Sequence, residues 1–151
     1  TSGGLIRVNT TSGAQTVVTA GGFLSDPVGI TAIAGNYFVA DAFNFGTAGG
    51  SIIRVNSLTG AQSVVHFGID LFDPIDIVAD SIGDLIVSDL APMAVGGPKI
   101  ARINTVSGAL STISAGGLLE SPAGIVVFPE PASLGILVIG GLLLKSRRRW
   151  R

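Results

Sequence analysis

The chain has 151 residues, of which 47% are hydrophobic and 13% charged, with one histidine and no cysteine. That length allows at most one ordinary domain with an appendage, and the missing cysteines exclude disulfides, cysteine-bound zinc and thiol catalysis. The net charge of −1 hides a division, because residues 1–128 carry nine acids and four bases whereas residues 129–151 carry one acid and five bases. We therefore treat 1–128 as an acidic body, unsuited to nucleic acid, and 129–151 as a basic tail.

The body contains an internal repeat of 47 to 48 residues, in which four short segments recur in the same order. The copies are 5–9, 52–56 and 100–104; 12–18, 59–65 and 107–113; 27–30, 74–77 and 122–125; and, without a third copy, 35–41 and 83–89. Each segment is rich in β-branched or aromatic residues and is bounded by Gly, Pro, Asn or Asp, which is typical of strands. We therefore expect an all-β body with four strands per repeat and about 11 strands, the last at Gly124–Val127.

Three segments carry a resemblance to a known family. The Pro27–Ile30 opening, the strand 35–41 and the Ile-Arg-Val-Asn hairpin resemble the NHL / SMP-30-like propeller repeats over about residues 3–128. The resemblance implies one four-stranded propeller blade per repeat. A closed propeller needs at least about four blades, so these strands make a partial propeller. The first residue is Thr1, so either a signal peptide has been removed or the sequence is a fragment. Because these strands cannot close a ring, we expect blades missing at the N-terminus, or else an open stack with exposed edges.

The tail carries an apolar segment, Ala132–Leu144, which as a helix would be about 20 Å long against a hydrocarbon core of about 30 Å. A basic stop follows it, made of Lys145, Arg147, Arg148, Arg149 and Arg151. The positive-inside rule keeps these residues cytoplasmic and places the body on the exported side. A buried C-terminal helix, an uncleaved membrane anchor and a processed sorting tail are the three interpretations, and the basic stop favours the last.

The order of features in the tail resembles the PEP-CTERM sorting signal of Gram-negative bacteria. Its motif is Pro129, Glu130, Pro131, Ala132 and Ser133, followed by the short hydrophobic helix and the arginines. The resemblance implies an exported protein that passes through the inner membrane by its C-terminal helix. It also implies cleavage by an exosortase-type enzyme, delivery to the cell surface or the extracellular matrix, and association with exopolysaccharide or a surface protein.

Several residues of the body are candidates for chemistry. Asp70, Asp76 and Asp80 have no counterparts in the other repeats, and their carboxylates suit Ca²⁺, although turn caps are the alternative. Asp41 and Asp89 recur and are expected to be structural. The arginines Arg7, Arg54 and Arg102 also recur, and we expect them to guard strand edges or to pair with a repeated carboxylate rather than to form a charged ring.

Two further features concern the surface. His66 follows a strand of an outer hairpin and has no counterpart, so we expect an ordinary surface or edge histidine. The loop 43–50 and its counterpart Leu90–Pro98 are the longest connections, and long loops commonly carry binding. Phe43 and Phe45 would stack on a sugar or a peptide, or else cover a neighbouring blade.

The sequence favours a non-enzymatic protein that binds or scaffolds at the cell surface. The alternative is a metal-dependent lactonase or lyase, which the propeller resemblance allows because such enzymes gather acidic, Asn or His groups on their innermost strands. Of the innermost segments here, 29–33, 76–80 and 124–127, only the middle one contains acids. The alternative would therefore depend on Asp76 and Asp80.

Overall fold

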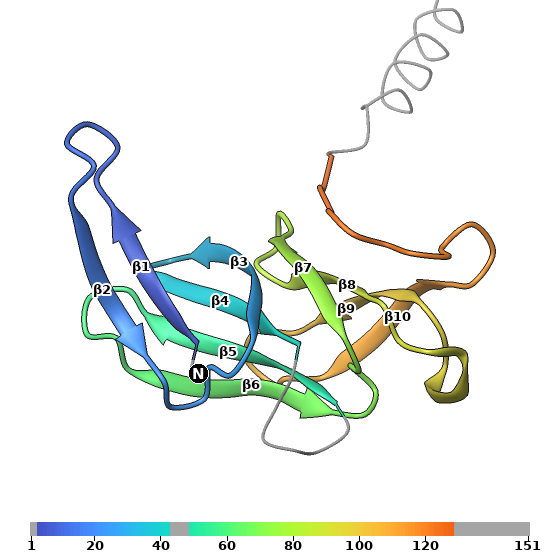
Figure 1. Ribbon diagram of the computed structural model, residues 1–151. Coiled ribbons are helices and arrows are strands. Elements are labelled where there is room, and N and C mark those ends of the chain that lie inside the picture. Colours follow the sequence, from blue (N-terminus) through green and yellow to red (C-terminus); the bar gives the residue numbers. More distant parts are fainter. Residues whose placement is uncertain (1–2, 43–48, 129–151) are drawn as a thin grey trace, which may run out of the picture.

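The computed structural model describes residues 3–42 and 49–128, which form an all-β structure (Figure 1). Within these residues, ten strands make three antiparallel sheets. The first sheet is the hairpin of β1 (Gly4–Val8) and β2 (Gln15–Ala20). The second contains β3 (Pro27–Ile33), β4 (Asn36–Asp41), β5 (Gly50–Asn56) and β6 (Gln62–Gly68). The third contains β7 (Pro74–Ala79), β8 (Leu85–Asp89), β9 (Lys99–Ile103) and β10 (Leu110–Ala115), with a single 3-10 turn at Met93–Val95.

The sheets follow one another in chain order, and each strand pairs with the next strand of its own sheet. The first strands of the two four-stranded sheets, β3 and β7, pack side by side near the middle of the molecule (Figure 1). The predicted set of four strands per repeat is thus confirmed for both complete repeats, and the first hairpin supplies the third and fourth strands of another. Over residues 3–42 and 49–128, the sheets do not close into a ring.

The eleventh strand is a wrong prediction, because residues 122–128 form no strand. This segment still lies along the third sheet: the Ile125 N–H donates to Asp76 Oδ2 (3.0 Å), and Ser88 Oγ donates to the Ala123 carbonyl (2.7 Å). The strands β3 and β7 exist because β4 and β8 pair with them. Among residues 3–42 and 49–128, no further strand pairs with this segment, so it completes no ladder there.

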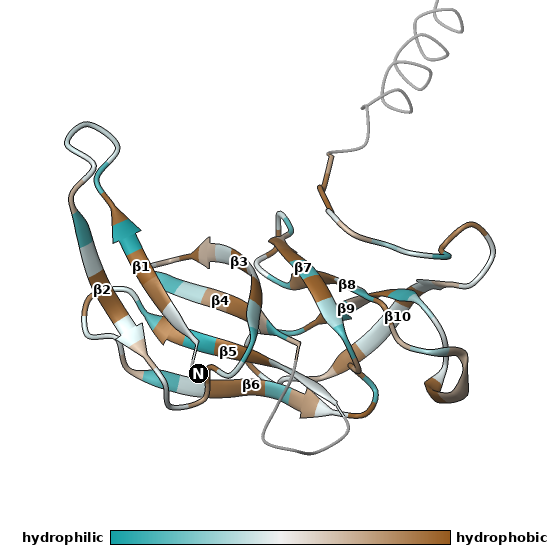
Figure 2. Cartoon of the chain, viewed as in Figure 1, coloured by the Kyte–Doolittle hydropathy of each residue, from teal (hydrophilic) through white to brown (hydrophobic). Residues whose placement is uncertain are grey.

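Two hydrophobic clusters hold the sheets together. Between the first and second sheets, Leu24, Val39, Ile53 and Val55 are buried, with Leu5, Val18 and Tyr37 packed against them. Between the second and third sheets the cluster contains Phe38, Ala40, Ile52, Leu71, Ile77, Leu85, Val87 and Ile103. Neighbouring residues of β5 belong to different clusters, so this strand is buried on both faces, as its continuous apolar sequence predicts. Figure 2 shows apolar colouring concentrated in the strands, whereas the β1–β2 turn is pale to hydrophilic.

Each outer hairpin carries a β-bulge at the same repeat position. In the pairings β1–β2, β5–β6 and β9–β10, the register skips one residue, which is Val18, Val65 and Ile113 respectively. The extra residue of a bulge is left out of the ladder and bends its strand. Because they are outside the ladder, Val18 and Val65 pack against the sheet that follows them.

The hairpin turns contain a glycine at a positive φ angle, and two of these glycines touch the sheet before them. A side-chain carbon on Gly60 (φ +71°) would lie 2.3 Å from the Val18 carbonyl oxygen. One on Gly108 (φ +71°) would lie 2.1 Å from the Val65 carbonyl oxygen. Gly13 has the same conformation (φ +72°) but has no atom within 4 Å, because no sheet precedes the first hairpin in the described structure. Only glycine therefore fits the two inner junctions.

The predicted C-terminal helix, Ala132–Leu144, lies outside the described residues. Among the residues that the structure describes, no helix has the length and apolar character needed to span a bilayer.

Candidate functional site

The three candidate calcium ligands lie on different parts of the fold. Asp70 is exposed in the loop after β6, and its Oδ1 lies 3.2 Å from Nε2 of His66. Asp76 stands in β7 and accepts two backbone N–H groups, its Oδ1 from Ile77 (2.8 Å) and its Oδ2 from Ile125 (3.0 Å). Asp80 follows β7. Within residues 3–42 and 49–128, no three His, Cys, Asp or Glu side chains are placed to hold a metal ion together.

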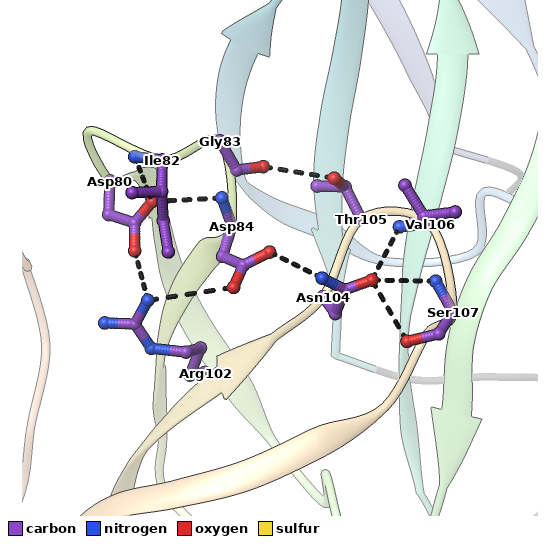
Figure 3. Close-up of polar contacts among 9 residues, drawn as sticks. All are labelled: Asp80, Ile82, Gly83, Asp84, Arg102, Asn104, Thr105, Val106 and Ser107. Carbon is purple, nitrogen blue, oxygen red and sulfur yellow. Dashed lines mark hydrogen bonds and ion pairs between the residues drawn. The ribbon is translucent and has the colours of Figure 1, made fainter.

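Asp80 belongs to a polar network that joins the β7–β8 turn to β9 (Figure 3). Its Oδ1 accepts the N–H groups of Ile82 (2.9 Å) and Asp84 (3.0 Å), and its Oδ2 pairs with Nη1 of Arg102. Asp84 in turn accepts from Asn104 Nδ2 (2.9 Å) and lies 3.7 Å from the same arginine nitrogen. A carboxylate that already has a cation and two N–H donors is a turn cap rather than a free ligand. The structure thus brings Asp80 together with Arg102 and not with Asp70 or Asp76.

The repeated arginines connect neighbouring sheets. Nη2 of Arg7 donates to the Ser57 carbonyl (2.8 Å) in the second sheet and to the Tyr37 hydroxyl (3.2 Å). Nη2 of Arg54 donates to the carbonyl of Thr105 in the third sheet, at the equivalent position. Its guanidinium also lies 5.3 Å from the centroid of the Phe38 ring, within the range of a cation–π contact. Within residues 3–42 and 49–128, the expected pairing with a repeated carboxylate is not found, because Arg102 pairs with Asp80 and Asp84, which do not recur, and Arg7 and Arg54 donate to main-chain oxygen.

The repeated aspartates are structural, as expected. The Asp41 carboxylate accepts the N–H groups of Ser25 and Asp26, and the Asp89 carboxylate accepts those of Phe72 and Asp73. Each carboxylate thus fixes the loop that leads into its own sheet.

A residue that sequence analysis missed lies beside Asp89. Nζ of Lys99 donates to Asp89 Oδ2 at 2.6 Å, and both side chains are almost fully buried. Lys99 stands directly opposite Asp89 in the β8–β9 register, at the position that Ser51 occupies in the second sheet. The sequence does contain a signal for this pair: a lysine stands where the other repeat has the small residue Ser51, and both positions face a repeated aspartate. A buried pair of this kind fixes geometry and is costly to break.

His66 is not the ordinary surface residue that was expected, although its strand β6 is an edge strand. Its side chain is only 10% exposed, and its Nδ1 donates to the carbonyl of Gly108 (2.8 Å) in the third sheet. Thr19 holds the same repeat position and receives a hydrogen bond from Gln62 Nε2 (2.8 Å) in the second sheet. Both residues therefore join one sheet to the next.

The carboxyl of Asp73 has a pKa that its surroundings raise. Burial raises the pKa of its carboxyl above the ordinary 3.8, and the negative charges of Asp89 and Asp26 raise that pKa further. Asp26 and Asp73 both precede the proline that opens a four-stranded sheet, so the repeat itself brings these like charges near one another.

The loop predicted to bind a partner lines an open pocket. Leu90–Pro98 forms one wall of an open pocket of about 480 Å³, and residues 116–120 form the other. The lining is mainly apolar, with Leu90, Ala91, Pro92, Met93 and Leu119. Glu120 is the charged residue among those that line the pocket, and Met93 is strongly exposed. Such a concave apolar surface with one charge suits a ligand that has an apolar group and a cationic or hydroxyl group.

Other predicted site residues cannot be placed. Phe43 and Phe45 lie outside the described residues, as do the sorting motif Pro129, Glu130, Pro131, Ala132 and Ser133 and the basic stop Lys145, Arg147, Arg148, Arg149 and Arg151. The pocket at Leu90–Pro98 is therefore the part of the predicted binding surface that the structure describes.

Comparison of the chain with protein-family models finds no matching model, and comparison with curated proteins finds no matching relative.

Proposed function

We propose that this chain is an exported bacterial protein, sorted to the cell surface or the extracellular matrix, whose body binds or scaffolds a partner without catalysing a reaction. The observation that carries the binding role is the open apolar pocket formed by Leu90–Pro98 and residues 116–120. A non-enzymatic role is further supported by the acids of the third sheet, since Asp76, Asp80 and Asp89 are each engaged by backbone N–H groups.

The body is proposed to be part of a β-propeller. Its four-stranded antiparallel sheets run in chain order and succeed one another with β3 beside β7, which is how blades follow one another around a propeller axis. The sheets bury their faces only against neighbouring sheets, as repeat proteins do. The described residues belong to three blades, and a closed propeller ring needs at least about four.

The pocket favours a segment of a surface protein over a polysaccharide as its occupant. Sugars are commonly held by aromatic rings, and among the residues that the structure describes no aromatic side chain lines this pocket. Proline, methionine and leucine side chains instead offer an irregular apolar surface, and methionine adapts well to varied peptide side chains. The Glu120 carboxylate would then pair with a lysine or arginine beside the apolar side chain of the bound segment.

The binding proposal is tested by presenting the purified chain with a display library of peptides and, separately, with exopolysaccharide from the producing cells. We expect peptides that combine a large apolar residue with Lys or Arg to be enriched. Met93→Asp and Glu120→Lys should each weaken their binding at least about tenfold. Val106→Asp is the matched control, because Val106 is strongly exposed in the β9–β10 turn of the same sheet and lies away from the pocket. Binding of polysaccharide alone, unaffected by Met93→Asp, would contradict the choice of ligand.

The sorting proposal depends on the sequence of the tail. Intact mass and terminal-peptide mapping of the protein from its own cells should give a product that ends near Pro129–Pro131. Replacing Glu130 by Ala should leave the tail attached and the protein in the inner membrane. The matched control is Glu120→Ala, which removes a carboxylate from the body. A native product that retains Arg151 would contradict processing and leave a membrane anchor.

A further inference from the structure

We propose that one end of the body rests on the bilayer that holds the apolar tail segment, so that the pocket at Leu90–Pro98 faces away from the membrane. This hairpin end is where β1, β3, β5, β7 and β9 finish and turn back. The opposite end, where β3, β5, β7 and β9 begin, is the loop end and carries the pocket. The inference rests on the proposed passage through the inner membrane, and it adds which part of the body lipid contacts.

The turns of the second and third sheets form one continuous hairpin end. Within the second sheet, the Ser57 N–H donates to the Gly35 carbonyl (3.0 Å) and so joins the β5–β6 turn to the β3–β4 turn. Between the sheets, Arg54 donates to the Thr105 carbonyl in the β9–β10 turn. Within the third sheet, Thr105 Oγ1 donates to the Gly83 carbonyl (3.1 Å) of the β7–β8 turn, and Figure 3 shows these two turns together. A flat surface can therefore meet all four turns at once.

Three of these turns present an apolar side chain at the tip. Leu58 is 91% exposed, Ile82 76% and Val106 92%. Their backbone N–H groups donate within their own turns, to the side-chain Oδ1 atoms of Asn56 (3.0 Å), Asp80 (2.9 Å) and Asn104 (3.1 Å). Leu58 is exposed although its sheet has a neighbour on each side, so the exposure belongs to the turn itself. Apolar tips whose N–H groups are already satisfied enter an apolar medium without leaving a donor unpaired.

The charges of the body are divided between its two ends. The hairpin end has three bases and two acids, a net charge of +1, and its acids are paired with one of the bases: Arg7, Arg54, Arg102, Asp80 and Asp84. The loop end has six acids and one base, a net charge of −5: Asp26, Asp41, Asp70, Asp73, Asp89, Glu120 and Lys99. The ninth acid of the body, Asp76, stands in β7. A bilayer with anionic lipids therefore repels the loop end and accepts the hairpin end.

The path of the chain brings the hairpin end to the membrane. In the repeat, Phe128 holds the position of Ile33, which is the last residue of β3 before its turn. Figure 1 shows the segment 122–128, in orange, passing β7 and ending on the side of the β7–β8 turn. The apolar sequence begins at Ala132, so at most about 14 Å of chain separates it from Phe128. The loop end lies a strand length farther away, about 20 Å.

The absence of cysteine from the sequence allows single labelling sites. Leu58→Cys, Ile82→Cys and Val106→Cys place an environment-sensitive fluorophore at each tip of the hairpin end. Leu118→Cys is the matched control, because Leu118 is fully exposed after β10 at the loop end. Each full chain is reconstituted into vesicles of phosphatidylethanolamine and phosphatidylglycerol, with and without lipids that carry a nitroxide quencher on the acyl chain.

We expect the three hairpin labels to shift their emission to the blue and to lose fluorescence to the nitroxide lipids. The label at Leu118 should keep the emission of a probe in water and respond to aqueous iodide instead. Lipid quenching at Leu118 as strong as at the hairpin positions would overturn the inference, and so would hairpin labels that stay in water. Hairpin labels shielded from iodide without lipid quenching would also overturn it, because a protein would then cover this end.

Flotation of the vesicles separates failure of this inference from failure of the sorting proposal. A chain that does not float with the vesicles would contradict the proposed passage through the membrane and this inference together. A chain that floats, with its hairpin labels in water, would contradict the inference alone.

Charged variants test whether the apolar tips themselves make the contact. In the chain labelled at Ile82→Cys, the pair Leu58→Glu and Val106→Glu should abolish lipid quenching, because two carboxylates would have to enter the bilayer. Leu118→Glu in the same labelled chain is the control and should leave the quenching unchanged. All three positions are strongly exposed, so circular dichroism should show the same strand content for each variant. Quenching that survives the double substitution would overturn the inference.

Discussion

Gly108 lies against the main-chain carbonyl of Val65 in the neighbouring sheet, so close that a side-chain carbon at Gly108 would be 2.1 Å from that oxygen. Alanine at Gly108 should therefore cost about 1–2 kcal/mol for the left-handed backbone and about 1–3 kcal/mol more for overpacking. Gly13→Ala shares the backbone cost alone, since its φ is the same and its surroundings are open. Urea unfolding of both variants measures the difference in their free energies of unfolding. Equal losses for the two variants would show that the contact between Gly108 and Val65 adds no overpacking cost.

Lys99 and Asp89 form a buried ion pair whose members should be strongly coupled. Lys99→Met leaves the Asp89 carboxylate buried with only N–H donors, and we expect a loss of about 3–5 kcal/mol. Adding Asp89→Asn should recover part of that loss, because the uncompensated charge is removed. Chemical unfolding of the two single variants and the double variant forms a mutant cycle. Additive losses would contradict the coupling.

Asp73 should make stability depend on pH in the direction opposite to that of a salt-bridged aspartate. Because its pKa is raised in the folded state, the ionised carboxylate lowers the free energy of unfolding at neutral pH. The penalty disappears as pH falls through the folded-state pKa. Asp73→Asn should therefore stabilise the protein at about pH 7, by up to about 0.5 kcal/mol, and the gain should shrink towards about pH 4. A gain that grows on acidification would be inconsistent with this sign.

Calcium should leave thermal stability unchanged. Asp70, Asp76 and Asp80 lie on separate elements, and each already has a hydrogen-bond or ion-pair partner. A ligand at free concentration L that binds only the folded state raises the free energy of unfolding by RT ln(1 + L/Kd), so even a weak site shows at high ligand concentration. We expect the same unfolding midpoint with EDTA and with about 10 mM Ca²⁺. A rise of several degrees with Ca²⁺ would restore a metal site and, with it, the enzymatic alternative.

The internal repeat predicted the sheets well because strand formation depends on local residues that recur, such as the apolar runs and the turn glycines. It predicted the strand at Gly124–Val127 wrongly because a strand also needs a partner, and local sequence does not say whether one follows. The same limit applies to the residues that join sheets. His66 and Lys99 break the repeat, so their contacts with Gly108 and Asp89 depended on how the sheets and strands lie together.

The pocket was predicted only in part. Loop length pointed to Leu90–Pro98, and the structure shows that this loop lines a pocket. Residues 116–120 form the other wall of the pocket. The sequence did not predict this, because these residues follow β10 and meet Leu90–Pro98 only once the third sheet has folded. The candidate metal ligands shared only their absence from other repeats, and such a pattern contains no information about distance.

The arginine contacts between sheets have an asymmetry that bears on how such arrays diverge. Arg7 and Arg54 donate to the main-chain oxygens of Ser57 and Thr105, and those acceptors persist whatever side chain occupies either position. Substitutions in the turn thus leave the contact standing, whereas loss of the arginine removes it. A lineage can accordingly change the side chains at these two acceptor positions, and duplicate whole units, while the arginine and the turn glycine of each junction are kept.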